Sequence, residues 1–227
     1  MVGAGIAGIL AAKNAAKNNL KTLLVDEKNE LGGATIYQNR EFNKIENQSS
    51  SDWLKKEIQG LKDIENLEVK TRTSVAAYHG YNYLLARENL TDHLEKKDKQ
   101  GKIRQRLLKI RAKKVILATG ALERPLIFNN NDRPGIMLSS AVNKYADFYG
   151  VVCGQKTVFF TNNDSAYESA FCLHNKGIKV EAIIDIRDNS NSKIVKAVED
   201  AGIKIHWSHT VVDTSGYKKL KNISVMR

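Results

Sequence analysis

The sequence predicts an α/β protein with two lobes, each built from alternating strands and helices. Three observations lead to this prediction. The chain opens with a glycine-rich turn in front of a helix, strand-like and helix-like segments alternate along most of its length, and an irregular segment at 122–135 contains both prolines. Repeated strand–helix–strand units of this kind form a parallel sheet covered by helices.

The glycine-rich turn has the spacing G-x-G-x-x-G at Gly3, Gly5 and Gly8. In dinucleotide-binding folds the first glycine makes a tight turn, the second leaves room for the pyrophosphate, and the third lets the helix approach the sheet. The pattern alone is weak evidence, because it requires a preceding strand. Only Met1 and Val2 precede it here. We therefore expect a truncated first strand and a chain that begins inside a domain.

The glycine turn is followed by an Ala-rich helix at 6–18 and a buried strand at 21–25. Ile6 and Ala7 provide the first backbone N–H groups of this helix, and Asp26 ends the strand. An acidic residue about twenty positions after the glycines bonds the adenosine ribose in this fold. We expect that role for Asp26, with Glu27 beside it; the alternative is a solvated carboxylate.

A second glycine pair extends the pattern at Gly32 and Gly33, where the backbone would pass close to the cofactor. A helix is expected at 51–61, followed by strands at 67–71 and 73–77. Val75, in the second of these strands, occupies the position at which such folds bring the backbone alongside the adenine.

The segments 78–88 and 104–111 alternate weakly and predict an inserted β-ribbon within about 67–111. An apolar strand at 114–117 then leads into Ala118, Thr119 and Gly120. Small residues at this point would let the chain approach the dinucleotide, although a simple turn glycine is the alternative for Gly120. A connecting segment and a helix at 136–149 follow.

The strand–helix alternation repeats from residue 154, with strands at 156–161, 179–185 and 203–207 and helices at 165–176 and 192–201. The turn after the first of these strands has no glycine, and Asp164 would place a negative charge where a pyrophosphate should lie. We expect a second, degenerate and incomplete Rossmann-like lobe that binds no dinucleotide in the usual way. The expected division is 1–125, 126–153 and 154–227.

Composition excludes several other classes of protein. The hydrophobic content of 42% and 227 residues suit a folded domain, and the formal charge of +11 is spread over helix faces without a nucleic-acid-binding motif. Cys153 and Cys172 form no C-x-x-C motif, so neither a zinc site nor a redox pair is expected. The histidines show no metal-ligand spacing and no catalytic set emerges. We expect a cytoplasmic protein that binds neither nucleic acid nor a membrane.

Taken together, these stretches resemble the α subunits of heterotetrameric sarcosine oxidases. The resemblance is carried by the glycine turn, by Gly32-Gly33, by the segment 110–121 and most specifically by 123–138, which reads ERPLIFNNNDRPGIML; the turn 161–167 adds to it. Subunits of opine oxidase and of hydrogen cyanide synthase share much of this region.

The resemblance implies a Rossmann-like FAD/NAD(P)-binding fold whose first lobe holds NAD, or FAD in some relatives. The family enzymes oxidise the N-methyl group of sarcosine to give glycine and peroxide, and can pass the one-carbon unit to tetrahydrofolate. Amine oxidation belongs to a partner β subunit that carries FAD, FMN lies at the α–β contact, and further small subunits complete the complex. Two alternatives remain open: an FAD-binding subunit of a related amine or opine dehydrogenase, and a non-catalytic interaction module.

Overall fold

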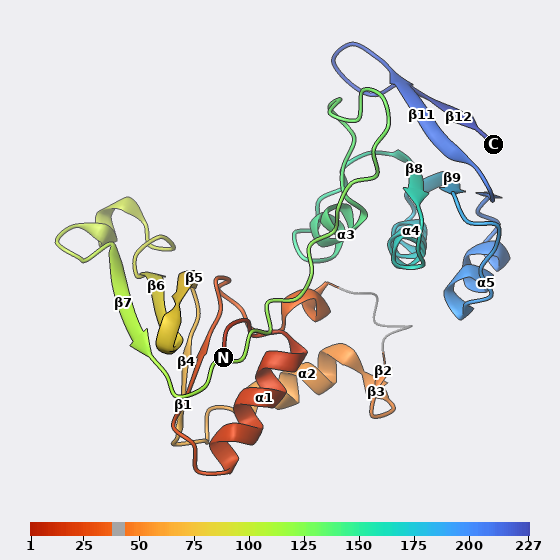
Figure 1. Cartoon of the computed structure of the whole chain (residues 1–227). Coiled ribbons are helices and arrows are strands. Elements are labelled where there is room, and N and C mark those ends of the chain that lie inside the picture. Colours follow the sequence, from red (N-terminus) through yellow and green to blue (C-terminus); the bar gives the residue numbers. More distant parts are fainter. Residues whose placement is uncertain (38–43) are drawn as a thin grey trace. The chain divides into compact units, whose positions relative to one another are not determined.

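The computed structural model describes residues 1–37 and 44–227, which form two compact units (Figure 1). The first unit comprises Met1–Ile36 and Ile45–Ala121. The second comprises Leu122–Arg227 together with the described residues Tyr37 and Lys44. The mixed α/β architecture predicted from the sequence is confirmed.

A parallel sheet forms the centre of the first unit. Strand β1 (Thr22–Val25) pairs in parallel with β4 (Leu67–Lys70), and Val2 bridges in parallel to both Val25 and Leu117. The resulting order is Leu117, Val2, β1 and β4, so the opening residues lie between segments that are distant in sequence. Val2 therefore lies at the centre of the sheet, and the glycine turn begins directly after it.

Two helices complete the core of the first unit. Helix α1 (Ile6–Lys17) buries Ile9 and Ala12 completely, and α2 (Ser50–Gln59) buries Trp53 and Leu54 in the same apolar cluster. The Ser49 hydroxyl caps α2 by accepting the Asp52 N–H. Short elements link these parts: η1 (Gly33–Ile36), β2 (Lys44–Ile45) and β3 (Gln48–Ser49).

The predicted β-ribbon has three antiparallel strands in place of two. They are β5 (Thr73–His79), β6 (Tyr83–Asn89) and β7 (Gln105–Arg111), with short helical turns η2 (Gly80–Asn82) and η3 (Lys96–Lys99) between them. The expected single segment 78–88 is therefore wrong, because the chain reverses at Tyr81 and Asn82, which adopt positive φ values of 58° and 53°. The ribbon also begins at Thr73, since β4 belongs to the parallel sheet.

The strand expected at 114–117 is reduced to one bridge. Val2 N–H donates to the Ile116 carbonyl (2.9 Å), and Ala118 N–H donates to the Val2 carbonyl (2.7 Å). The segment is thus extended and paired with Val2 through Leu117.

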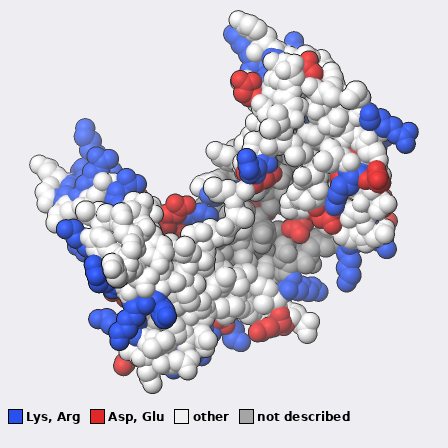
Figure 2. All heavy atoms as spheres, in the orientation of Figure 1, with Lys and Arg blue, Asp and Glu red and all other residues white. Residues whose placement is uncertain are grey.

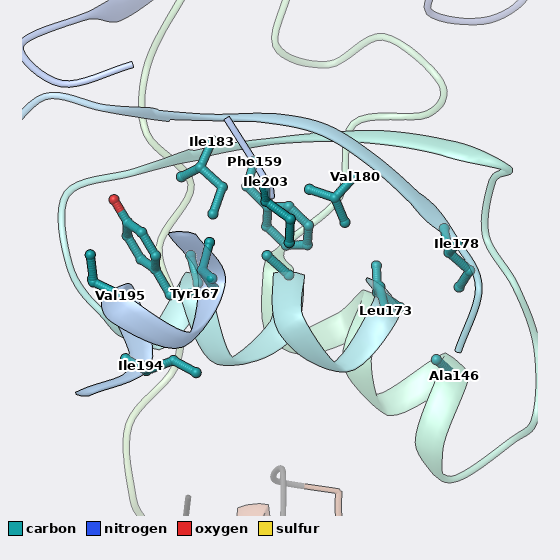
Figure 3. Close-up of a cluster of buried hydrophobic side chains, with 13 residues drawn as sticks. Ala146, Phe159, Tyr167, Leu173, Ile178, Val180, Ile183, Ile194, Val195 and Ile203 are labelled. Atoms are coloured by element: carbon teal, nitrogen blue, oxygen red, sulfur yellow. The ribbon is translucent and has the colours of Figure 1, made fainter. Parts of the chain in front are cut away.

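The second unit has its own parallel sheet, in the order β10 (Ile205–His206), β9 (Lys179–Asp185) and β8 (Lys156–Thr161). Helices α3 (Ser139–Asp147), α4 (Ser165–Asn175) and α5 (Lys193–Asp200) contribute to its core, shown in Figure 3. Tyr167 of α4 and Val198 of α5 are fully buried there. The strands and helices predicted for this lobe are confirmed, with ends that differ by up to three residues.

An antiparallel hairpin follows β10 and was not predicted. Its strands are β11 (Thr210–Ser215) and β12 (Asn222–Met226). The Arg133 side chain donates to the carbonyl of Gly216, so the polar segment between the two prolines is tied to this hairpin.

Candidate dinucleotide-binding site

Three segments meet at the glycine turn through backbone hydrogen bonds. Gly3 N–H donates to the Val25 carbonyl (2.8 Å), Gly32 N–H to the Ala4 carbonyl (2.7 Å), and Ala118 N–H to the Val2 carbonyl (2.7 Å). The structure therefore brings together the opening motif, the second glycine pair and the Ala118-Thr119-Gly120 segment, as the sequence pattern predicts.

The glycines of the motif are required for different reasons. A Cβ atom on Gly3 (φ 94°) would lie 2.3 Å from the Ala118 carbonyl oxygen, and one on Gly8 would lie 1.8 Å from the Gly3 carbonyl oxygen. Gly33 is similarly confined, because its Cβ would lie 3.0 Å from the Gly5 Cα. Packing within the protein accounts for these positions.

Gly5 differs from its neighbours, because a Cβ atom there would meet nothing within 4 Å. Its φ of −72° is open to any residue. Neither packing nor backbone conformation therefore requires a glycine at this position. The open space beside Gly5 is a cradle that a side chain would fill, which fits the close approach of a pyrophosphate.

The N-terminus of α1 opens onto the same space. Gly5 is the N-cap residue, no side chain caps the helix, and the first turn contains no acidic residue. The first N–H groups of the helix, from Ile6, Ala7 and Gly8, have no partner one turn back within the helix. Together with the helix dipole, they favour a bound anion.

Asp26 lies directly behind the turn. Its Oδ2 accepts the Ala4 N–H at 2.6 Å, and its Oδ1 accepts the Lys28 N–H at 2.8 Å. These contacts give the carboxylate a role in holding the turn that the sequence did not indicate. Each oxygen still has a second lone pair, so the carboxylate can also accept from a ribose hydroxyl. Glu27 is exposed next to it.

The remaining predicted residues are positioned by the sheet. Thr73 N–H donates to the Asp26 carbonyl (2.7 Å), so β5 starts beside Asp26 and carries Val75 two residues further on. Thr119 and Gly120 follow Ala118 and are exposed, and Gly120 has a φ of 72°. Their contact with a cofactor remains a prediction.

The equivalent turn of the second unit is closed by its own side chains. Asn163 Oδ1 accepts the Ser165 N–H (3.0 Å) at the start of α4. Asp164 pairs with the Arg187 guanidinium (2.8 Å), which also binds the fully buried Asp185 (2.7 Å). The Tyr167 hydroxyl also belongs to this network, because it donates to Asp185 Oδ2 at 2.8 Å.

Ionisation follows from these contacts. Burial, followed by the hydrogen bond to Asp185, raises the pKa of Tyr167 well above its ordinary value. Burial acts to raise the pKa of Asp164, but hydrogen bonds led by that of Arg187 outweigh it and hold the pKa below its ordinary value. Tyr167 is therefore neutral and the Asp164 carboxylate ionised at neutral pH.

Sequence reasoning missed one further carboxylate. Glu123 accepts the N–H groups of Ser139 (3.0 Å) and Ser140 (2.8 Å), and so caps α3 from a distance of sixteen residues in sequence. These bonds overcome the effect of burial and hold the pKa of Glu123 below its ordinary value. The only sequence signal was an acidic residue inside the segment 123–138.

The described residues form neither a metal cluster nor a membrane-spanning helix. Among residues 1–37 and 44–227, no three His, Cys, Asp or Glu side chains gather in a way that could hold a metal ion. No helix within those ranges is long and apolar enough to cross a membrane. Cys153 is exposed, and Cys172 is buried with its Sγ donating to Asp147 Oδ2 at 3.3 Å.

A glycine turn at the centre of a parallel sheet, followed by a second unit of the same topology, defines the class of Rossmann-type FAD/NAD(P) oxidoreductase folds. Solved structures agree with this class. A thioredoxin reductase from T. acidophilum matches with a TM-score of 0.68 at 17% identity over 99% of this chain and 68% of that chain. An L-proline dehydrogenase from P. horikoshii matches with a TM-score of 0.64 at 23% identity over 98% and 37%.

The chain belongs to the pyridine nucleotide-disulphide oxidoreductase family, whose model matches residues 1–226. It is 39% identical to sarcosine oxidase subunit alpha of Corynebacterium sp. (strain P-1) over 214 residues, which is 94% of this chain and 22% of that protein. It is 34% identical to the subunit of the same name from Rhizobium meliloti over 82% of this chain and 18% of that protein. The resemblance predicted from the sequence is confirmed, and the chain spans about a fifth of the length of these relatives.

Proposed function

We propose that this chain is the dinucleotide-binding part of the α subunit of a sarcosine-oxidase-type complex, and that NAD binds at its glycine turn. The observation that carries the proposal is Gly5, a glycine that neither its φ nor any contact with the described residues requires. A pyrophosphate seated against Gly5 and the uncapped start of α1 supplies the missing reason.

The residues of the first unit divide the binding between them. Gly5, Ile6, Ala7 and Gly8 hold the pyrophosphate, and Asp26 bonds the adenosine ribose while it anchors Ala4. Gly33, Val75, Thr119 and Gly120 provide backbone beside the rest of the ligand. NAD, when bound, supplies the capacity to carry a hydride.

The similarity to sarcosine oxidase subunit alpha supports the assignment to an oxidative demethylation of sarcosine to glycine. The resemblance to these α subunits implies that amine oxidation belongs to a partner β subunit with its own flavin, and we place that step there. Small subunits complete the proposed hetero-oligomer. The chain contributes the dinucleotide site to this complex.

FAD at the same turn is the second candidate. NAD and FAD share the adenosine diphosphate half that this turn recognises, so the glycines do not distinguish them. The fold similarity to an L-proline dehydrogenase over 98% of the chain favours an FAD-binding subunit of a related amine dehydrogenase as this alternative.

An absorption spectrum and ligand extraction after native purification separate the candidates. A colourless protein that releases NAD on denaturation supports the proposal. Flavin absorption with release of FAD overturns it in favour of the second candidate. Release of neither ligand, from a preparation that also fails to bind added NAD, favours a non-catalytic interaction module.

Gly5→Val tests the proposed site directly. The valine side chain fills the space beside the phosphates, so NAD binding should weaken at least roughly a hundredfold, whereas the fold remains because nothing lies within 4 Å of the new Cβ. Titration calorimetry measures the binding and circular dichroism the fold. Gly80→Val is the matched control, because Gly80 also has open space but lies in the turn between β5 and β6. Equal NAD affinity of the two variants would refute the site.

A further inference from the structure

A second cavity lies in the first unit, away from the glycine turn. Its volume is about 540 Å³, and its lining includes Arg87, Lys99 and Arg104. This volume is within the usual range for small-molecule sites, roughly 300–1,000 Å³. None of the residues assigned to the dinucleotide lines it.

The antiparallel sheet explains why these residues meet. Arg87 and Asn89 are two positions apart in β6, so their side chains lie on the same face. Gln105 of β7 is in register with Asn89, and its Nε2 donates to Asn89 Oδ1 at 2.8 Å. Arg104 stands just before β7, and Lys99 ends η3 in the connection between the two strands.

The three cations of this cavity are exposed, and none is paired within the described residues. Arg87, Lys99 and Arg104 make no ion pair or side-chain hydrogen bond within the described part of the chain. Among the described lining residues the acid is Asp92, and the Arg72 guanidinium, at 2.9 Å, already neutralises it. The cavity therefore concentrates positive charge without internal compensation.

The adjacent position of β6 shows the contrast. Glu88 points to the opposite face from Arg87 and is paired with Lys70 (3.3 Å) and Arg106 (3.6 Å). Lys70 also pairs with Glu68 (3.1 Å), so two carboxylates balance these two cations, whereas those of the cavity are not balanced. Figure 2 shows Lys and Arg side chains gathered over the part of the molecule that carries β6 and β7 in Figure 1.

We propose that this cavity binds a compact organic phosphate, a small molecule with at least two phosphate charges. Arginine and lysine together with amide donors form the donor set that recognises phosphate oxygens, and a multiply charged anion relieves the repulsion between the three cations. The volume exceeds what one inorganic phosphate needs. The inference is independent of the function proposed for the glycine turn.

The test uses inorganic pyrophosphate as the probe, titrated calorimetrically into the whole chain carrying Gly5→Val, so that the glycine turn cannot contribute. We expect saturable binding to that protein. Replacing Arg87, Lys99 and Arg104 together by Gln should weaken it roughly a hundredfold. The matched control replaces three other exposed cations of the first unit, Lys17, Lys21 and Lys62, by Gln and removes the same net charge. That control should bind with an affinity within about twofold of the parent, because distant exposed charges are screened.

Several outcomes would overturn the inference. No saturable binding to the Gly5→Val protein would remove the site, and equal weakening by the two triple variants would reduce it to general electrostatic attraction. Tighter binding of a hexaglutamate peptide than of pyrophosphate would replace the small phosphate by an acidic protein segment. By contrast, loss of NAD binding in Gly5→Val with retained pyrophosphate binding would support the inference, because it separates the two sites from each other.

Discussion

The two units share a strand–turn–helix–strand arrangement, but the turn is open in the first unit and filled by side chains in the second. In the first, Val2 leads through Gly3 and Gly5 into α1, and Asp26 follows the end of β1. In the second, β8 leads through Asn163 and Asp164 into α4, and β9 ends at Asp185. Topology alone therefore does not determine whether a strand–turn–helix unit can bind a dinucleotide.

The difference lies in what satisfies the start of each helix. The first unit leaves the N–H groups of α1 uncapped beside open space at Gly5. The second supplies Asn163 Oδ1 to the Ser165 N–H and fills the turn with the Asp164–Arg187 pair. A turn that occupies its first helix N–H with a side chain and places a carboxylate beside it disfavours a phosphate.

The two strand-end carboxylates show the same division. Asp26 is partly exposed and bonds two backbone N–H groups, so its outer lone pairs remain available. Asp185 is fully buried and is committed to Tyr167 and Arg187. The same residue type at the same topological position is open to a ligand in one unit and structural in the other.

The largest expected effect tests the packing glycines of the first turn. A methyl group on Gly8 would collide with the Gly3 carbonyl oxygen at 1.8 Å, and backbone atoms must shift to admit it. We expect Gly8→Ala to lower the free energy of unfolding by about 4 kcal/mol, and Gly5→Ala to change it by less than about 0.5 kcal/mol. Urea denaturation of both variants measures the difference. Similar midpoints would contradict the distinction between packing and ligand-facing glycines.

The next effect concerns the network that closes the second turn. Arg187→Met keeps the apolar stem but leaves the buried Asp185 carboxylate without its guanidinium, which should cost about 3 kcal/mol of unfolding free energy. Arg124→Met, at an exposed position of the same unit, should cost less than about 0.5 kcal/mol. If chemical denaturation gives the two variants equal stability, the network does not hold the second unit.

The sequence predicted most of the second unit because its signals are local. The apolar runs of β8 and β9 and the periodic face of α5 depend on neighbouring residues only. The Asp164–Arg187–Asp185 network is different, since its charges come from separate elements and meet only after folding. The hairpin β11–β12 was missed although Thr210–Ser215 is rich in β-branched residues, a signal that the sequence did contain.

The sequence predicted which residues form the candidate site, but not the structural role of each one. The spacing identified Gly3, Gly5 and Gly8 together, yet only the structure separates the two that packing requires from the one that it does not. Likewise, the sequence marked Asp26 for a ribose, whereas its bond to Ala4 depends on the turn geometry. The length of the strand at 114–117 could not be predicted either, because it depends on the partner beside it.

Acidification should lower the free energy of unfolding through Asp164, by less than the Arg187→Met substitution does. The folded state holds the pKa of Asp164 below its ordinary value, so its contribution to stability is present above the unfolded pKa and is lost as pH falls through the folded pKa. The contribution should be less than about 1 kcal/mol, because the side chain is 35% exposed and solvent screens the pair. Thermal unfolding between about pH 6 and 2 should show a smaller acid-induced loss for Asp164→Asn than for the parent. An identical pH profile for both proteins would remove Asp164 from the acid response.

For the last variant, Asp164→Gly, we expect no change in NAD affinity. Asp164→Gly removes the negative charge and supplies a glycine, which would create a phosphate turn if the charge were the only obstacle. The Asn163 side chain still occupies the Ser165 N–H, and Asp185 still holds Arg187. NAD titrated into the Gly5→Val, Asp164→Gly double variant should therefore bind no more tightly than to Gly5→Val alone. A new NAD site in the double variant would show that a single charge separates the two turns, and that the surrounding hydrogen bonds adapt to the ligand once this charge is gone.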